Sequence, residues 1–361
     1  MKKYVVMIMF LLLVPFKVLA NSSYIVMDGY SGRVLEGSNI NDEMLIASTT
    51  KIMTAIIAIE NADLNSKVTI SKDVLKAYGS NIYIEVGEEI SLRDLLYGLL
   101  LRSGNDAAIE IARFVGGSME EFANLMNRKA HELGMNNTNF INSSGLEDEN
   151  KTGNTSTAYD MALLMSYAIK NEEFVKITGT KKHIVTTNYK TYEWHNKNRL
   201  LSSYKYCIGG KTGFTKLARR TLVTAAKKDD KLLVVVTLND GDDFNTHKYL
   251  YEKNFKNYNL VKIIEKGNIK IDNNIFYDNL YIEDDIKALL TRDEEKKIKV
   301  EYELEKKNNY SDNEIVGSVL VKIDNKLLLS RPIYVLKDNK EIKNEKKSWL
   351  QKIIDFLIFW R

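Results

Sequence analysis

The chain has 361 residues, of which 44% are hydrophobic and 28% are charged. This composition is typical of globular proteins and excludes collagen-like and highly charged disordered chains, and the length suits about two domains. With 52 basic and 48 acidic residues the formal net charge is only +4, which gives no support for nucleic-acid binding.

The N-terminus has the pattern of an export signal. Two lysines precede the apolar run YVVMIMFLLLVPF, and Val18 and Ala20 stand at the small-residue positions before a cleavage site. We predict residues 1–20 to be a signal peptide that is cut before Asn21. An uncleaved membrane anchor is the alternative, although the apolar run is short for a bilayer span. Cleavage removes three lysines and leaves 49 basic against 48 acidic residues.

Residues 21–256 are predicted to mix strands and helices. SYIVMDGYSGRVLEG is typical of two strands around a glycine-containing turn, and RRTLVTAAKK and KLLVVVTLN are typical of two more. Between them, SLRDLLYGLLL, SMEEFANLMNRKAHELG and TAYDMALLMSYAIKN carry apolar residues at helical spacing. The pattern predicts an α/β (α+β) domain with a sheet lobe and a helical lobe, and a cleft between lobes is a usual place for an active site.

The opening of one helix carries candidate chemistry. In LIASTTKIMTAIIAIE, Ser48 and Lys51 are three positions apart and would share a face of a helix predicted from Lys51 to Glu60. A serine nucleophile needs a base within hydrogen-bond reach, and a lysine can be that base only when burial, the helix dipole or a nearby cation keeps it neutral. SxxK alone is weak, because Ser202 and Lys205 form a second copy in a polar stretch.

A second motif, SGN, follows the apolar helix LLYGLLL. Ser103 on a loop facing the nucleophile could pass a proton to a leaving amine, and the Asn105 amide could hold a peptide carbonyl or the lysine. A decoy copy, SDN at 311–313, lies in a β-rich region near charged residues.

The third motif, KTG, lies in CIGGKTGFTK. The cation of Lys211 and the hydroxyl of Thr212 on an edge strand could grip a substrate carboxylate, while Gly213 lets the backbone approach the ligand. A second KTG at 151–153 stands in a polar loop with no strand beside it, so we assign it no catalytic role.

After about residue 257 the pattern changes. Residues 257–336 are predicted to form a small all-β domain: KIKVEYELE alternates apolar residues, and GSVLVKIDNKLLL is typical of a hairpin around Asp324 and Asn325. Residues 337–361 comprise a charged linker and an amphipathic segment, KSWLQKIIDFLIFWR, predicted to lie as a helix in a membrane surface. A terminal helix docked on the protein itself is the alternative.

The order and context of the three motifs match the set of the penicillin-binding proteins and β-lactamases. With YIVMDGYSGRVLEG, GMNNTNFINSSGL, STAYDMALL and GGKTGFT, the chain resembles the low-molecular-mass penicillin-binding proteins that are D-alanyl-D-alanine carboxypeptidases. The likeness covers nearly the whole mature chain. It implies a β-lactamase/transpeptidase-like domain with an antiparallel sheet, followed by a β-rich domain and an amphipathic tail.

The resemblance also implies an acyl-enzyme mechanism without a cofactor. Ser48 would attack the carbonyl between the two terminal D-alanines of a peptidoglycan stem peptide, with Lys51 taking its proton. Ser103 would help to pass that proton to the departing D-alanine, and Asn105 would orient the substrate and the lysine. β-Lactam antibiotics should acylate the same serine.

The remaining implied roles concern substrate binding. Lys211 and Thr212, with Gly213, would bind the terminal carboxylate, and the backbone amides of Ser48 and Phe214 would form the oxyanion hole. The family layout further implies an exported enzyme held on the outer face of the cytoplasmic membrane. Two departures from the family are the positions near Arg219, commonly glycine, and near Asn154, commonly histidine.

Rival functions are weaker. A zinc carboxypeptidase would need clustered ligands, and the four histidines, at positions 131, 183, 195 and 247, form no HExxH pair. A class A-like β-lactamase would need a glutamate for deacylation, but Glu147 and Glu149, which follow the SGN motif, lie in a stretch that resembles the carboxypeptidases. Such an enzyme would also not normally carry an extra β domain and a membrane-surface tail. A catalytically silent penicillin- or peptidoglycan-binding protein is the non-enzymatic alternative, and the intact motifs argue against it. Cys207 is the only cysteine, so an intrachain disulfide is excluded, and a packed role is favoured over a reactive one.

Overall fold

The computed structural model describes residues 22–336 except residues 273, 278 and 308. The predicted signal peptide at 1–20 and the predicted linker and membrane-surface helix at 337–361 lie outside the described residues. In the part that is described, no helix combines the length and the apolar character needed to cross a membrane.

The first domain is built on one five-stranded antiparallel sheet. Its strand order is β2-β1-β11-β10-β9. The bounds are β1 Ser23–Asp28, β2 Val34–Ser38, β9 Cys207–Thr215, β10 Arg219–Lys228 and β11 Lys231–Leu238. The two ends of the domain thus meet in one sheet, since β1 pairs with β11, and β9 is left as an edge strand, as the sequence pattern predicted.

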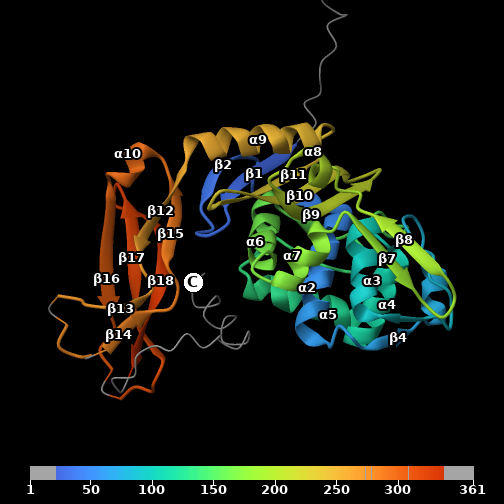
Figure 1. The fold of residues 1–361 in the computed structure, drawn as a ribbon, viewed down its shortest axis with the longest axis horizontal. Helices are drawn as coiled ribbons and strands as arrows, with labels where there is room; N and C mark the ends of the chain where they lie inside the picture. Colours follow the sequence, from blue (N-terminus) through green and yellow to red (C-terminus); the bar gives the residue numbers. More distant parts are fainter. Residues whose placement is uncertain (1–21, 273, 278, 308, 337–361) are drawn as a thin grey trace, which may run out of the picture.

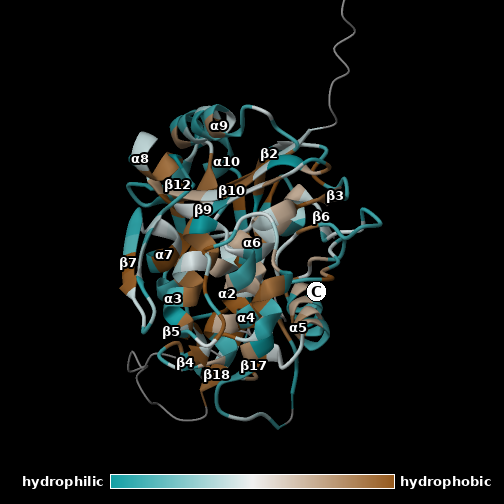
Figure 2. Ribbon diagram, turned by 90° about the vertical axis from the view of Figure 1, so that its right-hand side faces the viewer, coloured by the Kyte–Doolittle hydropathy of each residue, from teal (hydrophilic) through white to brown (hydrophobic). Residues whose placement is uncertain are grey.

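Helices cover one face of this sheet and form the helical lobe (Figure 1). They are α2 Lys51–Asn61, α3 Leu92–Tyr97, α4 Asn105–Gly116, α5 Met119–Glu132, α6 Ala158–Ala168 and α7 Glu172–Gly179, with the 3-10 turns η1 Ala47–Thr50 and η2 Lys72–Lys76 and the π-helix η3 Gly98–Arg102. Helix α2 is buried through residues 51–58 and packs on α4, α5, α6 and η3. Figure 2 shows hydrophobic residues gathered in this interior.

Short hairpins and two further helices complete the domain. The strand pairs are β3 Met44–Leu45 with β6 Thr155–Ser156, β4 Lys67–Thr69 with β5 Glu89–Ser91, and β7 Lys182–Thr186 with β8 Thr191–His195. The helices are α8 Leu200–Ser203 and α9 Asp243–Asn257. Helix α9 contacts β10 and β11 and leads directly to the second domain.

The second domain is built almost entirely of strands. One sheet has the order β13-β14-β18-β17-β16, and a second pairs β12 with β15. The bounds are β12 Asn259–Ile264, β13 Gly267–Ile269, β14 Asn279–Ile282, β15 Ile286–Leu290, β16 Ile298–Leu304, β17 Glu314–Ile323 and β18 Lys326–Leu336. The predicted hairpin is confirmed: Asp324 and Asn325 have φ angles of +48° and +63° between β17 and β18, as a tight two-residue turn requires.

One feature of this domain departs from the all-β prediction. A single helical turn, α10 Arg292–Glu295, follows β15. Thr291 and Glu294 form a capping box that satisfies the free N–H groups at its start. This helix has only four residues, all of them polar, so the sequence shows no helical periodicity that could have predicted it.

Polar contacts join the two domains. Asp28 at the end of β1 accepts a hydrogen bond from the backbone N–H of Leu289, at 2.8 Å. Arg33 donates to the carbonyl of Leu289, at 3.2 Å, and forms an ion pair with Glu294. Helix α10 is therefore part of the domain boundary.

Candidate active site

The turn before α2 presents Ser48 beside Lys51. Lys51 Nζ lies 3.0 Å from Ser48 Oγ. Lys51 is fully buried, whereas Ser48 is half-buried and reachable from solvent. Sequence periodicity predicted a shared helix face; in the structure Ser48 lies in the 3-10 turn η1 and only Lys51 belongs to α2. The preceding residue, Ala47, has φ +46°, a left-handed conformation that is strained for alanine.

The hydrogen bonds of Lys51 indicate where its lone pair points. Its amine lies 2.8 Å from Asn105 Oδ1 and 2.5 Å from the carbonyl oxygen of Ser144. Both oxygens can only accept, so they take the two N–H bonds of a neutral amine. The third neighbour, the Ser48 hydroxyl, can donate, and the remaining lone pair of Lys51 faces it. This arrangement suits a base that removes the hydroxyl proton.

The surroundings favour that neutral form. Burial lowers the pKa of Lys51 well below its ordinary value, and the positive charges of Lys211 and Lys197 lower it further. Asp106 acts in the opposite direction on this pKa and is the smaller influence. Lys197 was not a sequence candidate; it donates to Ser80 Oγ at 2.9 Å.

The SGN motif sits where η3 ends and α4 begins. Ser103 has φ +64°, and this turn carries the chain from the π-helix into α4. Asn105 donates from its backbone N–H to the carbonyl of Ser80 at 2.7 Å and from Nδ2 to the carbonyl of Tyr78 at 2.6 Å. These bonds direct Oδ1 at Lys51. The Ser103 side chain is buried, and its hydroxyl makes no hydrogen bond to any residue in the described ranges.

The KTG motif lies on edge strand β9, against the turn that carries Ser48. A Cβ on Gly213 would lie 3.1 Å from the backbone nitrogen of Ser48 and 2.3 Å from Thr221 Oγ1, so only glycine fits there. Lys211 is buried, and desolvation together with the charge of Lys197 lowers its pKa to about 7. Thr212 is half-buried and Phe214 is exposed.

A loop at 141–154 supplies the carbonyl that holds Lys51. Gly145 has φ +82°, and a Cβ on it would lie 1.9 Å from the carbonyl oxygen of Ala47. The Asn154 amide donates to Thr50 Oγ1 at 3.0 Å and to the carbonyl of Asn142 at 2.8 Å. Its oxygen accepts from the backbone of residues 141 and 142. The amide at 154 therefore ties this loop to the nucleophile turn.

The other departure from the family also has a structural account. Arg219 has φ +61° at the first position of β10, directly after the turn from β9. This conformation is one that glycine adopts without strain, which agrees with the residue expected there from the resemblance.

Two of the decoy motifs lie in other elements. Ser202, in α8, and Lys205 are exposed, and residues 311–313 are exposed in the second domain. The second KTG lies on the loop 141–154, where Lys151 and Thr152 are exposed. Burial raises the pKa of the Cys207 thiol to about 11, which disfavours the reactive thiolate.

Within the described residues, no group of three or more His, Cys, Asp or Glu side chains is arranged to hold a metal ion. Among the histidines, His247 is buried between Thr224 and Thr237, and His183 lies 2.7 Å from Asp94.

The chain matches known families along nearly its whole length. Residues 14–242 match the family model described as D-alanyl-D-alanine carboxypeptidase. Residues 258–341 match the model described as penicillin-binding protein 5, C-terminal domain.

Individual relatives span both domains. D-alanyl-D-alanine carboxypeptidase DacF of Bacillus subtilis is 32% identical over 88% of this chain and 86% of its own length. DacC of Escherichia coli is 30% identical over 88% of this chain and 84% of its own length. The crystal structure of penicillin-binding protein 5 from Haemophilus influenzae superposes with a TM-score of 0.71 at 26% identity, covering 88% of this chain and 96% of that one.

Proposed function

The chain belongs to the D-alanyl-D-alanine carboxypeptidase family of serine hydrolases, and we propose that it removes the terminal D-alanine from peptidoglycan stem peptides through an acyl-enzyme on Ser48. One observation supports Ser48 as the nucleophile: its hydroxyl lies beside the amine of Lys51. The other two neighbours of that amine, Asn105 Oδ1 and the Ser144 carbonyl, accept the N–H bonds of Lys51.

The first half-reaction forms the acyl-enzyme. Lys51 accepts the hydroxyl proton as Ser48 Oγ bonds to the carbonyl carbon of the penultimate D-alanine. The amide C–N bond breaks, and the amine of the departing D-alanine takes up the proton, with Ser103 in the proton path and Asn105 orienting Lys51 and the substrate. Water then attacks the ester, which releases the shortened peptide and restores the serine.

Strand β9 supplies the binding groups. Lys211 and Thr212 bind the terminal carboxylate of the substrate, and the backbone N–H groups of Ser48 and Phe214 stabilise the oxyanion. Support comes from the close approach of Gly213 to Ser48 N, which sets the strand beside the nucleophile. A β-lactam that mimics the same dipeptide acylates Ser48.

We also propose a localisation for the protein. Residues 1–20 would direct export, and the segment 347–361 would attach to the outer surface of the cytoplasmic membrane. The sequence pattern of apolar residues opposite lysines supports this.

Replacing Ser48 by alanine tests the nucleophile. The parent protein is expected to release D-alanine from a stem-peptide mimic and to gain the mass of benzylpenicillin on a peptide containing residue 48. Ser48→Ala should lose the benzylpenicillin adduct, and its kcat for D-alanine release should fall by at least about 10⁴-fold. Ser202→Ala, in the second SxxK copy, is the matched control and should keep both. Undiminished release by Ser48→Ala would refute the assignment.

A further inference from the structure

One wall of the active site is formed by residues 77–88, which we call the rim loop. The carbonyls of Tyr78 and Ser80 hold the side chain and the backbone of Asn105, at 2.6 and 2.7 Å. The hydroxyl of Tyr78 reaches the carbonyl of Glu147 across the site, at 2.7 Å. The first part of the rim loop therefore lies against Asn105 and beside the candidate site.

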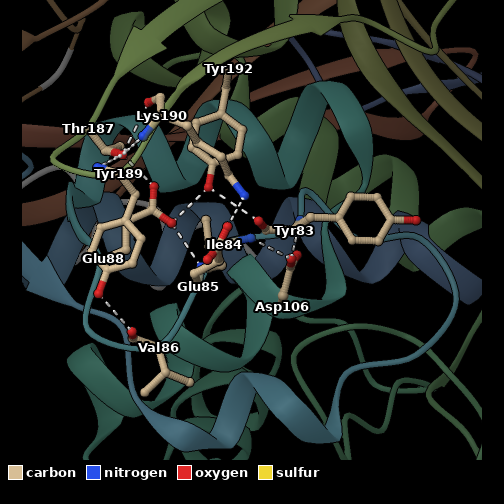
Figure 3. A network of polar contacts seen from close by, with 10 residues as sticks. All are labelled: Tyr83, Ile84, Glu85, Val86, Glu88, Asp106, Thr187, Tyr189, Lys190 and Tyr192. Carbon is tan, nitrogen blue, oxygen red and sulfur yellow. Dashed lines mark hydrogen bonds and ion pairs between the residues drawn. The ribbon is translucent and has the colours of Figure 1, made fainter.

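The backbone of the rim loop is held in a strained conformation at Tyr83. Its φ is +62°, a region that bulky side chains seldom occupy. The buried carboxylate of Asp106, next to Asn105, accepts the backbone N–H of Tyr83 at 2.7 Å and that of Ile82 at 3.0 Å. Figure 3 shows the bond between Tyr83 and Asp106 and the Tyr83 ring directed away from it.

A second buried carboxylate fixes the other end of the rim loop to the β7–β8 hairpin. Glu88 accepts hydrogen bonds from the hydroxyls of Thr187 and Tyr192, at 2.6 and 2.8 Å, and from the backbone of Glu85, at 2.8 Å. On the surface, Lys190 pairs with Glu85 at 2.5 Å. The rim loop is thus clamped at two points, as Figure 3 shows.

The clamped loop displays an aromatic side chain to water. Tyr83 is 72% exposed, and the rim loop and the β7–β8 hairpin also expose Tyr78 and Tyr189, which are 56% and 50% exposed. The Tyr83 ring contributes little to the core, yet its backbone is kept in a conformation that glycine or asparagine would adopt more readily. Strain that the surroundings enforce at the edge of a site points to a role in that site.

We propose that Tyr83 contacts the glycan of the substrate, with its ring packed against a pyranose ring of the strand that carries the stem peptide. This inference rests on the proposed function. Tyr83 is three residues beyond Ser80, whose carbonyl holds Asn105, and its backbone is bonded to Asp106, the next residue after Asn105, so it lies close to the candidate site but is not one of the groups around Ser48. An uncharged, amphipathic ring suits the C–H face and hydroxyls of a sugar, and Glu85, the nearby acid, is already paired with Lys190.

Two substrates and three variants test the contact. The substrates are a disaccharide-linked stem pentapeptide and the same pentapeptide without sugar. Tyr83→Gly is expected to raise KM about tenfold for the sugar-linked substrate, to leave KM for the free peptide unchanged, and to keep or raise Tm because the strain is relieved. Tyr83→Phe should stay within about twofold of the parent on both substrates, since it keeps the ring. Tyr249→Ala, an exposed tyrosine on α9, is the control.

The outcomes separate the alternatives. An equal rise in KM on both substrates would assign the ring to the peptide, and no rise on either would remove it from the site; both overturn the glycan contact. A fall in Tm for Tyr83→Gly would make the ring structural and overturn it as well. Benzylpenicillin should acylate every variant at the parent rate. A parent protein that cleaves neither substrate would refute the proposed function itself, and this contact with it.

Discussion

Two buried lysines dominate the chemistry at the scale of single residues. Lys51 and Lys211 are both buried, and burial together with neighbouring positive charge lowers the pKa of each side chain. Uncompensated buried charge destabilises a fold, so their joint presence favours activity over stability. Their proposed roles need opposite states: Lys51 has to be neutral to take a proton, and Lys211 has to be charged to bind a carboxylate.

These opposite requirements predict a bell-shaped pH dependence of kcat/KM. Activity should rise as pH passes upward through the pKa of Lys51, because the neutral amine forms, and fall as pH passes through about 7, because free Lys211 loses its proton. A guanidinium keeps its proton over this whole range. Lys211→Arg is therefore expected to lose the alkaline fall while keeping the acid limb, at a cost of about 10- to 100-fold in kcat/KM from its different shape.

The measurement is kcat/KM for a stem-peptide mimic between pH 5 and 10 for both proteins. In the parent, the kcat profile should fall at higher pH than the kcat/KM profile, because a bound carboxylate raises the pKa of Lys211. An alkaline limb that is unmoved in Lys211→Arg would show that another group titrates.

At the scale of elements, the sequence predicted the helices and strands whose apolar residues recur at regular intervals, and it missed an element too short to have such a period. Helical spacing predicted α2 and α6, and strand composition predicted β10 and β11, because their residues face a core at regular intervals. The single helical turn α10 has no such repeat.

The same limit applies to the site. The SxxK spacing was enough to predict that the Ser48 and Lys51 side chains would be neighbours. The Ser144 carbonyl and the Lys197 charge could not be predicted, since a backbone acceptor carries no residue signature, and Lys197 acts from a segment far along the chain. Only the tertiary fold brings these groups to Lys51.

The loop that supplies the Ser144 carbonyl predicts a sharp effect at Gly145. Alanine there would meet the carbonyl oxygen of Ala47 at 1.9 Å and Thr50 Oγ1 at 2.7 Å, so the loop must move away from the nucleophile turn. Gly145→Ala is expected to lower stability by about 3 kcal/mol or more and to slow acylation by penicillin about 100-fold.

Gly117→Ala separates backbone strain from this clash. Gly117 also has positive φ, +77°, but a Cβ there meets nothing within 4 Å. It should lose only about 1–2 kcal/mol and acylate normally. Stability would be measured by denaturant unfolding and acylation with a fluorescent penicillin; equal behaviour of the two variants would contradict the packing argument.

At the scale of the whole molecule, the two domains form a continuous unit with separate tasks. The site residues lie in the first domain, and the contacts of Asp28 and Arg33 with β15 and α10 fix the second domain to its sheet. A cavity of about 800 Å³ at this boundary is lined by Arg33, Tyr159 and Leu327 among others and contains none of the site residues. Within the described residues, the second domain therefore contributes none of the candidate site residues.

If that segment attaches to a membrane, removing it should change where the enzyme acts but leave its chemistry unaltered. A protein of residues 21–361 is expected to cosediment with vesicles that contain anionic lipid, and one of residues 21–336 to stay in solution. Apolar side chains enter the lipid surface, and each lysine near it adds about 1 kcal/mol. Both proteins should release D-alanine from a soluble peptide at the same rate. The double variant Ile353→Ser and Phe356→Ser of the longer protein keeps the charge of the segment and removes apolar area, so vesicle binding should weaken severalfold. Cosedimentation of the shorter protein would place the membrane contact elsewhere.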